Sequence, residues 1–462
     1  MKKPDRRKKN EILQHARWDP IIATLDISKV AVDHLRILDD FLAFIEKRQI
    51  TSIWSLRVSD FLSFDEAYQS ANRLRRLKHG MQSVFPDQPA ILVLTDAIRR
   101  KEAATRMPRT SGPRHRRLEK SIPADELPQI WKDALTDMEA GFDRNGVMAP
   151  SLRMIPTYRM KLRQLAFSAQ KAGLQAAFSP HALRAYGRDM RARDLSPATL
   201  RASFSAVQKC ARYVAADQEI IDFLAELLRI YEEKANKAPK KKYQKLQNTG
   251  YSPVAIVNQA SKLLSEASVL TCPKSRHAQR NTAAALALFS NLPLRLADTR
   301  LVFGKNVLWQ EGRYHLQAEI SKNQEPWSAE FDPRLNVFIN ALILRGCDKI
   351  WLEHMREECL RSSRPLFIRS DGEGVGYNYV SDCWRRVYGT GEHIARTIQH
   401  TFLGIELGPA GTDMALATCG QNSSQTQKHY QDDTVAKALR LKGQASLAEI
   451  PDIEYLKLFE LI

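Results

Sequence analysis

The sequence lacks several patterns that would assign it to common classes of protein. It contains no run of about 18 apolar residues, so we expect no transmembrane helix. Its basic start, MKKPDRRKKNEILQHARWDP, has no apolar stretch of the kind that a secretory signal needs. No Gly-rich phosphate-binding loop is present, so nothing in the sequence requires a nucleotide.

The cysteines are few and scattered. They form no CxxC pair, which favours neither a disulfide framework nor a zinc site and indicates a reducing compartment. We therefore expect a cytoplasmic protein with no cofactor and no bound metal. The six cysteines are Cys210, Cys272, Cys347, Cys359, Cys383 and Cys419.

Positive charge is what the chain has in excess. Its 462 residues include 70 lysines and arginines against 52 aspartates and glutamates, a formal net charge of +18. This charge favours a polyanionic partner, of which nucleic acid is the commonest. Residues 99–120 are rich in arginine with Pro, Ser and Gly, and residues 234–250 are rich in lysine. Both segments predict extended linkers, either solvated tethers or arms that contact DNA phosphates without reading sequence. The candidate contact residues are Arg114, Arg116, Arg117, Lys240, Lys241 and Lys242.

Six polar residues are spaced through the last third of the chain, within segments that predict scaffold elements. The apolar run TAAALALFSNLP predicts a buried helix that ends in a turn at Pro293, and Arg295 follows it. Lys322 lies in residues 307–331, which predict a strand, a turn and a strand. His393 and Arg396 form HIAR on an expected helix. The full set is Arg295, Lys322, His393, Arg396, Gln421 and Tyr430.

These residue types suit the cleavage of a phosphodiester by a tyrosine. Two guanidinium groups can bind both non-bridging oxygens as negative charge develops on them. A phenol, whose ordinary pKa is about 10, needs such positive surroundings to act as a nucleophile. A lysine can protonate the leaving 5′ oxygen, and a histidine supplies a second proton-transfer group. A covalent phosphotyrosine would conserve the bond energy, so the strand could be rejoined without metal or ATP.

In order and spacing, these residues resemble the active site of the tyrosine recombinase (phage integrase) family. That site consists of arginine, lysine, His-x-x-Arg, His or Trp, and tyrosine, and the matching segments here are LPLRLAD, ISKNQEP, HIAR and QTQKHY. Asp298 stands where the family usually has an acidic residue. The resemblance covers roughly residues 250–435 and lies in order and spacing, since each motif alone is weak.

The resemblance implies a role for each residue. Arg295 and Arg396 would hold the phosphate oxygens, and Lys322 would protonate the leaving oxygen. Tyr430 would form a 3′-phosphotyrosyl bond. His393 would assist proton transfer, and Gln421 would donate the hydrogen bond of the third motif.

Two departures from the family pattern bear on activity. Gln421 stands where the family has His or Trp, and a glutamine can donate a hydrogen bond but cannot carry a proton or a charge. The second motif also has two registers, because RTIQHTF resembles the family's HxLRHTF. That register would put Arg396 at the histidine position and Gln399 at the arginine position, with His400 as a core or substitute histidine. We favour HIAR because it supplies both required groups, and the second register stays open.

The fold class expected is mainly α and multidomain, with helical SAM-like core-binding modules and a mixed α+β catalytic domain that has a small β-sheet. Helical periodicity repeats in residues 33–87 and 158–217, and Ser196 with Pro197 is typical of a helix start. The expected segments are an N-terminal helical DNA-binding module with a basic arm and Arg-rich linker (1–120), a core-binding domain (121–245), the catalytic domain (246–435) and a C-terminal tail (436–462). Ser252 and Pro253 are expected to start the first catalytic helix. The tail is expected to pack on its own domain or on a neighbouring protomer.

The function expected is site-specific recombination or integration of double-stranded DNA through a 3′-phosphotyrosine. The resemblance implies a homo-oligomer on DNA that forms a tetramer at synapsis, alone or with partner recombinases. It also implies a nucleoid-associated protein with no membrane contact. A DNA-binding regulator with weakened or lost catalysis is the main alternative. A relaxing type IB topoisomerase is a third, less favoured because the paired helical modules suit site-specific binding.

Overall fold

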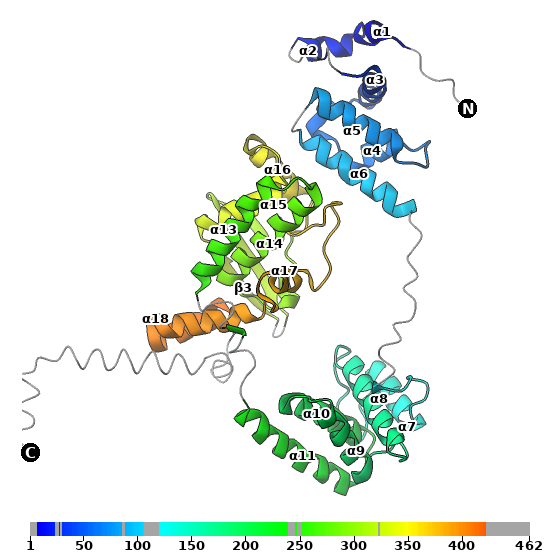
Figure 1. Cartoon of the computed structure of the whole chain (residues 1–462), viewed down its shortest axis with the longest axis vertical. Helices are drawn as coiled ribbons and strands as arrows, with labels where there is room; N and C mark the ends of the chain where they lie inside the picture. The colour runs from blue at the N-terminus through cyan, green and yellow to red at the C-terminus, as the bar shows by residue number, and fades with distance from the viewer. Residues whose placement is uncertain are drawn as a thin grey trace, which may run out of the picture. The chain divides into compact units, whose positions relative to one another are not determined.

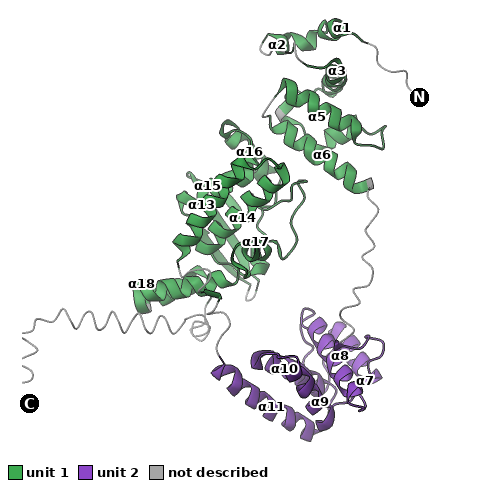
Figure 2. Ribbon diagram, in the orientation of Figure 1, with its two compact units in different colours: residues 1–107, 241–462 green, residues 108–240 purple. Residues whose placement is uncertain are grey.

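The computed structural model describes residues 7–23, 27, 30–85, 88–105, 120–238, 245–246, 252–321 and 324–421. In these residues the chain is mainly α-helical with one three-stranded antiparallel sheet, which confirms the expected fold class (Figure 1). Contacts divide it into two compact units, residues 1–107 with 241–462 and residues 108–240 (Figure 2). Within the described ranges, none of the helices is both long and apolar enough to cross a membrane.

The first part of unit 1 is a helical module with its own hydrophobic core. Apolar residues on α3 recur at 35, 38, 42 and 45, the spacing that puts one stripe of a helix against a core. Buried Trp18 donates its indole N–H to Asp39, 3.0 Å away, which joins the start of the chain to α3. The helices of this module are α1 (Lys9–Leu13), α2 (Asp19–Ile22), α3 (Val32–Lys47), α4 (Val58–Phe64), α5 (Asn72–Val84) and α6 (Pro89–Thr105), with short 3-10 turns at Ala16–Trp18 and Ile53–Ser55.

The second part of unit 1 is built around α14 (Pro273–Asn291). Every residue of α14 from 281 to 290 is buried, since the helix contacts α13, α15, α17 and α18. The prediction of a buried helix before Arg295 is therefore confirmed. Pro253 is the first residue of α13, as expected. The other helices are α13 (Pro253–Val269), α15 (Asn336–Leu344), α16 (Leu352–Arg361), α17 (Tyr379–Tyr388) and α18 (Ile394–Thr418), with 3-10 turns at Leu296–Thr299, Pro333–Leu335 and Lys349–Trp351.

The sheet consists of β1 (Val307–Gln310), β2 (Arg313–Ile320) and β3 (Glu325–Glu330) in that order. The turn between β1 and β2 has Glu311 and Gly312 at φ 50° and 77°. Two successive positive φ values are typical of the tight hairpin turns that match strand twist. The predicted strand pattern over residues 307–331 is confirmed, with a third strand added. Lys322 falls between β2 and β3 in the sequence, outside the described residues.

Unit 2 is entirely helical in its described residues apart from turns and one isolated bridge. The side chain of Ser196 accepts a hydrogen bond from the Thr199 amide at 3.3 Å, and Pro197 opens α10, which confirms the helix start predicted there. Ser179 and Pro180 start α9 in the same way. The helices are α7 (Gln129–Glu139), α8 (Ile155–Lys171), α9 (Pro180–Ala192), α10 (Pro197–Tyr213) and α11 (Gln218–Lys237).

Candidate active site

Arg295 is positioned by the end of α14. The helix ends at Asn291 and is followed by Pro293 and buried Leu294. Arg295 is the half-buried N-cap residue of the 3-10 turn Leu296–Thr299. Within that turn, buried Asp298 accepts a hydrogen bond from the Ser321 amide at 3.0 Å. Ser321 directly follows β2, so this bond holds the end of β2 against the segment that carries Arg295.

Arg396 lies in the first turn of α18 and is wholly buried. Its Nη2 donates to the backbone carbonyl oxygen of Cys419 at 2.6 Å. Its Nε and Nη1 have no hydrogen-bond partner in the part of the chain that the structure describes. A buried guanidinium is costly when its donors are unsatisfied. Arg396 therefore has two donors suited to an anion.

His400 and Gln421 form a buried polar pair. The Nε2 of His400 donates to the Gln421 Oε1 at 2.9 Å, since that oxygen can only accept. Gln421 reaches His400 because α18 ends just before it, at a turn with Gly420 at φ 56°. The indole N–H of Trp327 on β3 donates to the Ala417 carbonyl at 3.1 Å and so attaches this turn to the sheet.

The charges of both arginines act on Cys419. Burial raises the pKa of the Cys419 thiol to about 12, and the positive charges of Arg396 and Arg295 both act against that shift. Both guanidinium groups are therefore within electrostatic reach of one buried atom. Segments more than 100 residues apart in the sequence converge here, with Gln421 two residues beyond Cys419.

Glu392 adds a buried carboxyl group that the sequence analysis missed. It is 2% exposed, and burial raises its pKa to about 7. Arg396 and Arg385 oppose that shift, while the negative charge of Asp298 adds to it. Nothing in the local sequence distinguishes this residue from a surface glutamate, because its burial comes from packing between distant segments.

The two registers of the second motif differ in the structure. His393 is the exposed N-cap of α18, one residue before the helix begins at Ile394. Arg396 and His400 are fully buried and lie one helical turn apart, on the same side of α18. Gln399 is buried as well, and its amide donates to the Asn291 carbonyl at 3.5 Å. Of the two histidines, His400 is the one bonded to Gln421.

Of the predicted set, the structure places Arg396 and Gln421 close to Cys419 and His400, and Arg295 within electrostatic reach of Cys419. In the sequence, the resemblance of RTIQHTF to the family's HxLRHTF was the pattern that pointed to His400 as a site residue. Among the described residues, His, Cys, Asp and Glu side chains form no group of three or more that could hold a metal ion. The predicted residues outside the described ranges are Lys322, Tyr430, Arg114, Arg116, Arg117, Lys240, Lys241 and Lys242.

No protein-family model matches the chain. A search of curated proteins also finds no match. Among solved structures, the chain is similar to the XerH site-specific recombinase bound to a palindromic difH substrate in a post-cleavage complex, with 13% identity and a TM-score of 0.37 over 71% of this chain and 99% of that one. A pre-cleavage complex of XerH with difH gives 12% identity and a TM-score of 0.32 over 69% and 95%. These values are too low to assign a function.

Proposed function

We propose that the chain is a site-specific DNA recombinase that cuts and rejoins DNA through a phosphotyrosine at Tyr430. The observation that carries this proposal is the buried guanidinium of Arg396, bonded to the Cys419 carbonyl next to the hydrogen-bonded pair of His400 and Gln421, with the charge of Arg295 also acting on Cys419. Two guanidinium groups and an imidazole in a buried setting can stabilise the negative charge of a pentavalent phosphate far better than they could in water.

The reaction would begin with attack by the phenolic oxygen of Tyr430 on the scissile phosphorus. A bond forms between that oxygen and phosphorus as the phenol gives its proton to the imidazole of His400. The bond between phosphorus and the 5′ oxygen breaks as Lys322 gives that oxygen a proton. Arg295 and Arg396 would bind the non-bridging oxygens. Ser321, next to Lys322, is bonded to Asp298, which supports the idea that the turn after β2 delivers the lysine beside Arg295.

We assign the histidine role to His400 and not to exposed His393. His400 is oriented by its bond to the Gln421 Oε1, and Gln421 Nε2 has no partner within the described residues. Gln421 would therefore orient the imidazole with one end and donate to a phosphate oxygen with the other. This gives the third-motif glutamine a function without requiring it to carry a proton.

Double-stranded DNA is the proposed partner. The charge of +18 would favour binding to a polyanion, with the lysines and arginines of residues 99–120 and 234–250 on phosphates. The helical modules in 1–120 and 121–245 would clamp the duplex against the catalytic domain of 246–435. Four protomers would complete an exchange, with the tail 436–462 available to link them.

A DNA-binding regulator without catalysis is the second candidate. It is favoured by Gln399, a buried neutral side chain at the arginine position of the RTIQHTF register, and by the Arg396 nitrogen already bonded to Cys419. In that case the charge of the site would be insufficient to stabilise the transition state, while the basic surfaces would still hold DNA.

Trapping a covalent adduct tests the two candidates. The purified chain and its Tyr430→Phe variant would be incubated, with a metal chelator present, with nicked duplexes first enriched for binding from a random pool. An adduct that resists SDS and is lost in Tyr430→Phe would support the recombinase. Salt-sensitive binding by both proteins with no adduct would overturn it in favour of the regulator.

A further inference from the structure

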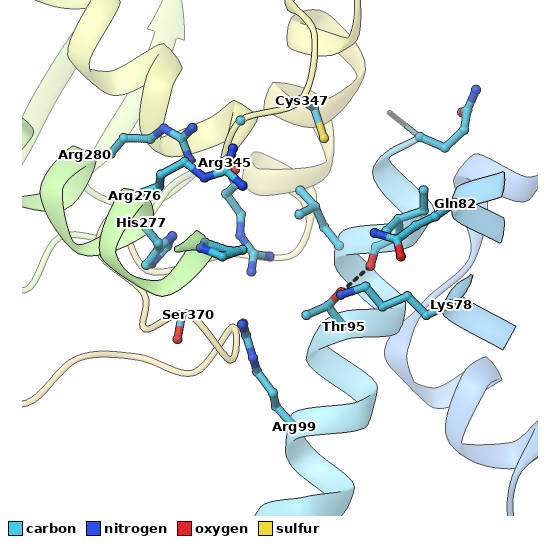
Figure 3. A pocket seen from close by; sticks show the side chains of 15 residues that line it. Lys78, Gln82, Thr95, Arg99, Arg276, His277, Arg280, Arg345, Cys347 and Ser370 are labelled. Carbon is cyan, nitrogen blue, oxygen red and sulfur yellow. Dashed lines mark hydrogen bonds between the residues drawn. The ribbon is translucent and has the colours of Figure 1, made fainter. Parts of the chain in front are cut away.

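A second cluster of cations lies away from the candidate active site, around a cavity inside unit 1. The cavity has a volume of about 430 Å³ and lies between α5 and α6 on one side and the start of α14 with the turn after α15 on the other. Figure 3 shows Lys78 and Arg99 facing it from the first side and Arg276, Arg280 and Arg345 from the second. None of the 15 described side chains that line it is a carboxylate.

One carboxylate close by neutralises only one of these five cations. Asp96 on α6 makes two hydrogen bonds to the guanidinium of Arg345, at 2.6 and 2.9 Å, and both side chains are about nine-tenths buried. Gly372 adopts φ 81°, and a Cβ there would lie 2.7 Å from the Asp96 carboxylate. The absence of a side chain at Gly372 therefore leaves room for the Asp96 carboxylate. The ion pair of Asp96 and Arg345 joins the N-terminal module to the catalytic part of the unit.

Within the described residues, no salt bridge joins the other four cations to a carboxylate, although the charge of Asp96 also acts on Lys78. Burial, followed by the charge of Arg99, lowers the pKa of Lys78, and burial followed by Arg276 lowers that of Arg280. Arg280 donates to the Arg345 carbonyl at 3.0 Å and passes over Gly346, where a Cβ would lie 2.7 Å from its Nη2. Arg280 is thus held in place by the fold and does not turn away from its neighbours.

Arg345 itself is incompletely bonded. Its Nε is buried and has no hydrogen bond to any residue the structure describes, although its other two nitrogens are paired with Asp96. An anion in the cavity would supply negative charge to the cations that line it and acceptors to those of their donors that face it.

We propose that this cavity binds a ligand carrying two or more phosphate groups. Five positive charges from two sides of the cavity are more than one carboxylate can neutralise. Guanidinium groups also match the bidentate geometry of phosphate oxygens. Ile91, Leu92 and Pro273 provide an apolar wall, and Gln82 and Thr95 are polar, so a nucleoside polyphosphate has complementary surroundings. The volume lies in the range of small-molecule sites. The same phosphate chemistry is available from a free nucleotide or from a segment of DNA backbone.

The ligand would bridge the N-terminal module and the catalytic part of unit 1, whose positive charges repel one another across the cavity. If the ligand binds only when these two parts are docked, it would favour the docked over the undocked state by a factor of about 100 at a ligand concentration of 100 Kd. The cavity lies at the beginning of α14 and Arg295 just beyond its end, about 27 Å along the helix at 1.5 Å per residue. This site is therefore separate from the candidate active site, and the inference does not depend on the recombinase proposal.

Calorimetric titration of the full chain with pyrophosphate and with ATP, in low-chloride buffer without metal, tests the inference. The test variants are Arg99→Gln and Arg276→Gln, whose half-buried side chains line the cavity from opposite sides. Arg76→Gln on α5 and Lys274→Gln on α14 are matched controls, since these exposed residues lie on the same helices and do not line the cavity. Each test variant should weaken binding at least tenfold and each control less than twofold, with thermal melting of all four unchanged.

A 20-base-pair duplex distinguishes the sources of phosphate. If pyrophosphate or ATP binds and the duplex does not displace it, the ligand is a free phosphate compound. If the duplex binds with the same tenfold sensitivity to Arg99→Gln and Arg276→Gln and displaces pyrophosphate, the ligand is the DNA backbone. If neither small anion nor duplex shows that sensitivity, or the controls weaken binding equally, the inference is wrong.

Discussion

Glu392→Gln should change how the stability of the catalytic part depends on pH. The carboxyl group is 2% exposed, and its pKa in the folded chain is raised to about 7 from an ordinary 4.5 because burial disfavours the charged form. The folded state therefore holds this proton more tightly than the unfolded state between pH 4.5 and 7. The stabilising effect is fully present below 4.5 and is lost as the pH rises through 7.

The size of the effect follows from the two pKa values. The free energy of unfolding should fall by about 1.4 kcal/mol for each pH unit in that window, a total of about 3.5 kcal/mol. Glutamine cannot titrate, so the variant lacks this slope. The difference in unfolding free energy, variant minus wild type, should therefore grow by about 2.5 kcal/mol from pH 5 to pH 8.

Urea unfolding at pH 5, 6, 7 and 8 measures that difference. Because a chain with several modules need not unfold in one step, hydrogen exchange of peptides from α14 and α17 should follow the transition in parallel. Glu357→Gln is the control, since Glu357 is exposed on α16. Parallel curves for wild type and Glu392→Gln, or a difference that shrinks as the pH rises, would refute the reasoning from burial.

Three further predictions concern single substitutions. His400→Ala should lower the rate of adduct formation on nicked duplexes by 100-fold or more, whereas His393→Ala should lower it less than threefold; equal losses would contradict the choice of histidine. Gln421→His should raise that rate about tenfold, because an imidazole can also transfer a proton, and a fall in rate would show that the bond from the glutamine oxygen matters more. Asp96→Asn should weaken docking of residues 7–105 by about 3 kcal/mol, because the charge of Arg345 stays buried without its partner; unchanged hydrogen exchange of α6 would contradict this.

The sequence by itself determined the elements that depend on local chemistry. The apolar run before Arg295 predicts a buried helix because its hydrophobic residues leave no polar face, and α14 is buried from 281 to 290. Ser196 with Pro197 predicts a helix start because a hydroxyl can accept from the amide three residues on, and Pro lacks an amide that would need a partner. Residues 307–331 likewise predict strands on either side of a turn, around Lys322.

Only the tertiary structure decided which side chains meet. His393 and His400 stand on the same segment, and local sequence favours the first, yet packing of α18 exposes His393 and buries His400 against Gln421. The pair of Asp96 and Arg345 joins residues 249 positions apart. No periodicity or spacing encodes such a contact, because it depends on how separately folded helices pack. The burial of charge, and with it the candidate active site and the cation-lined cavity, arises at that level.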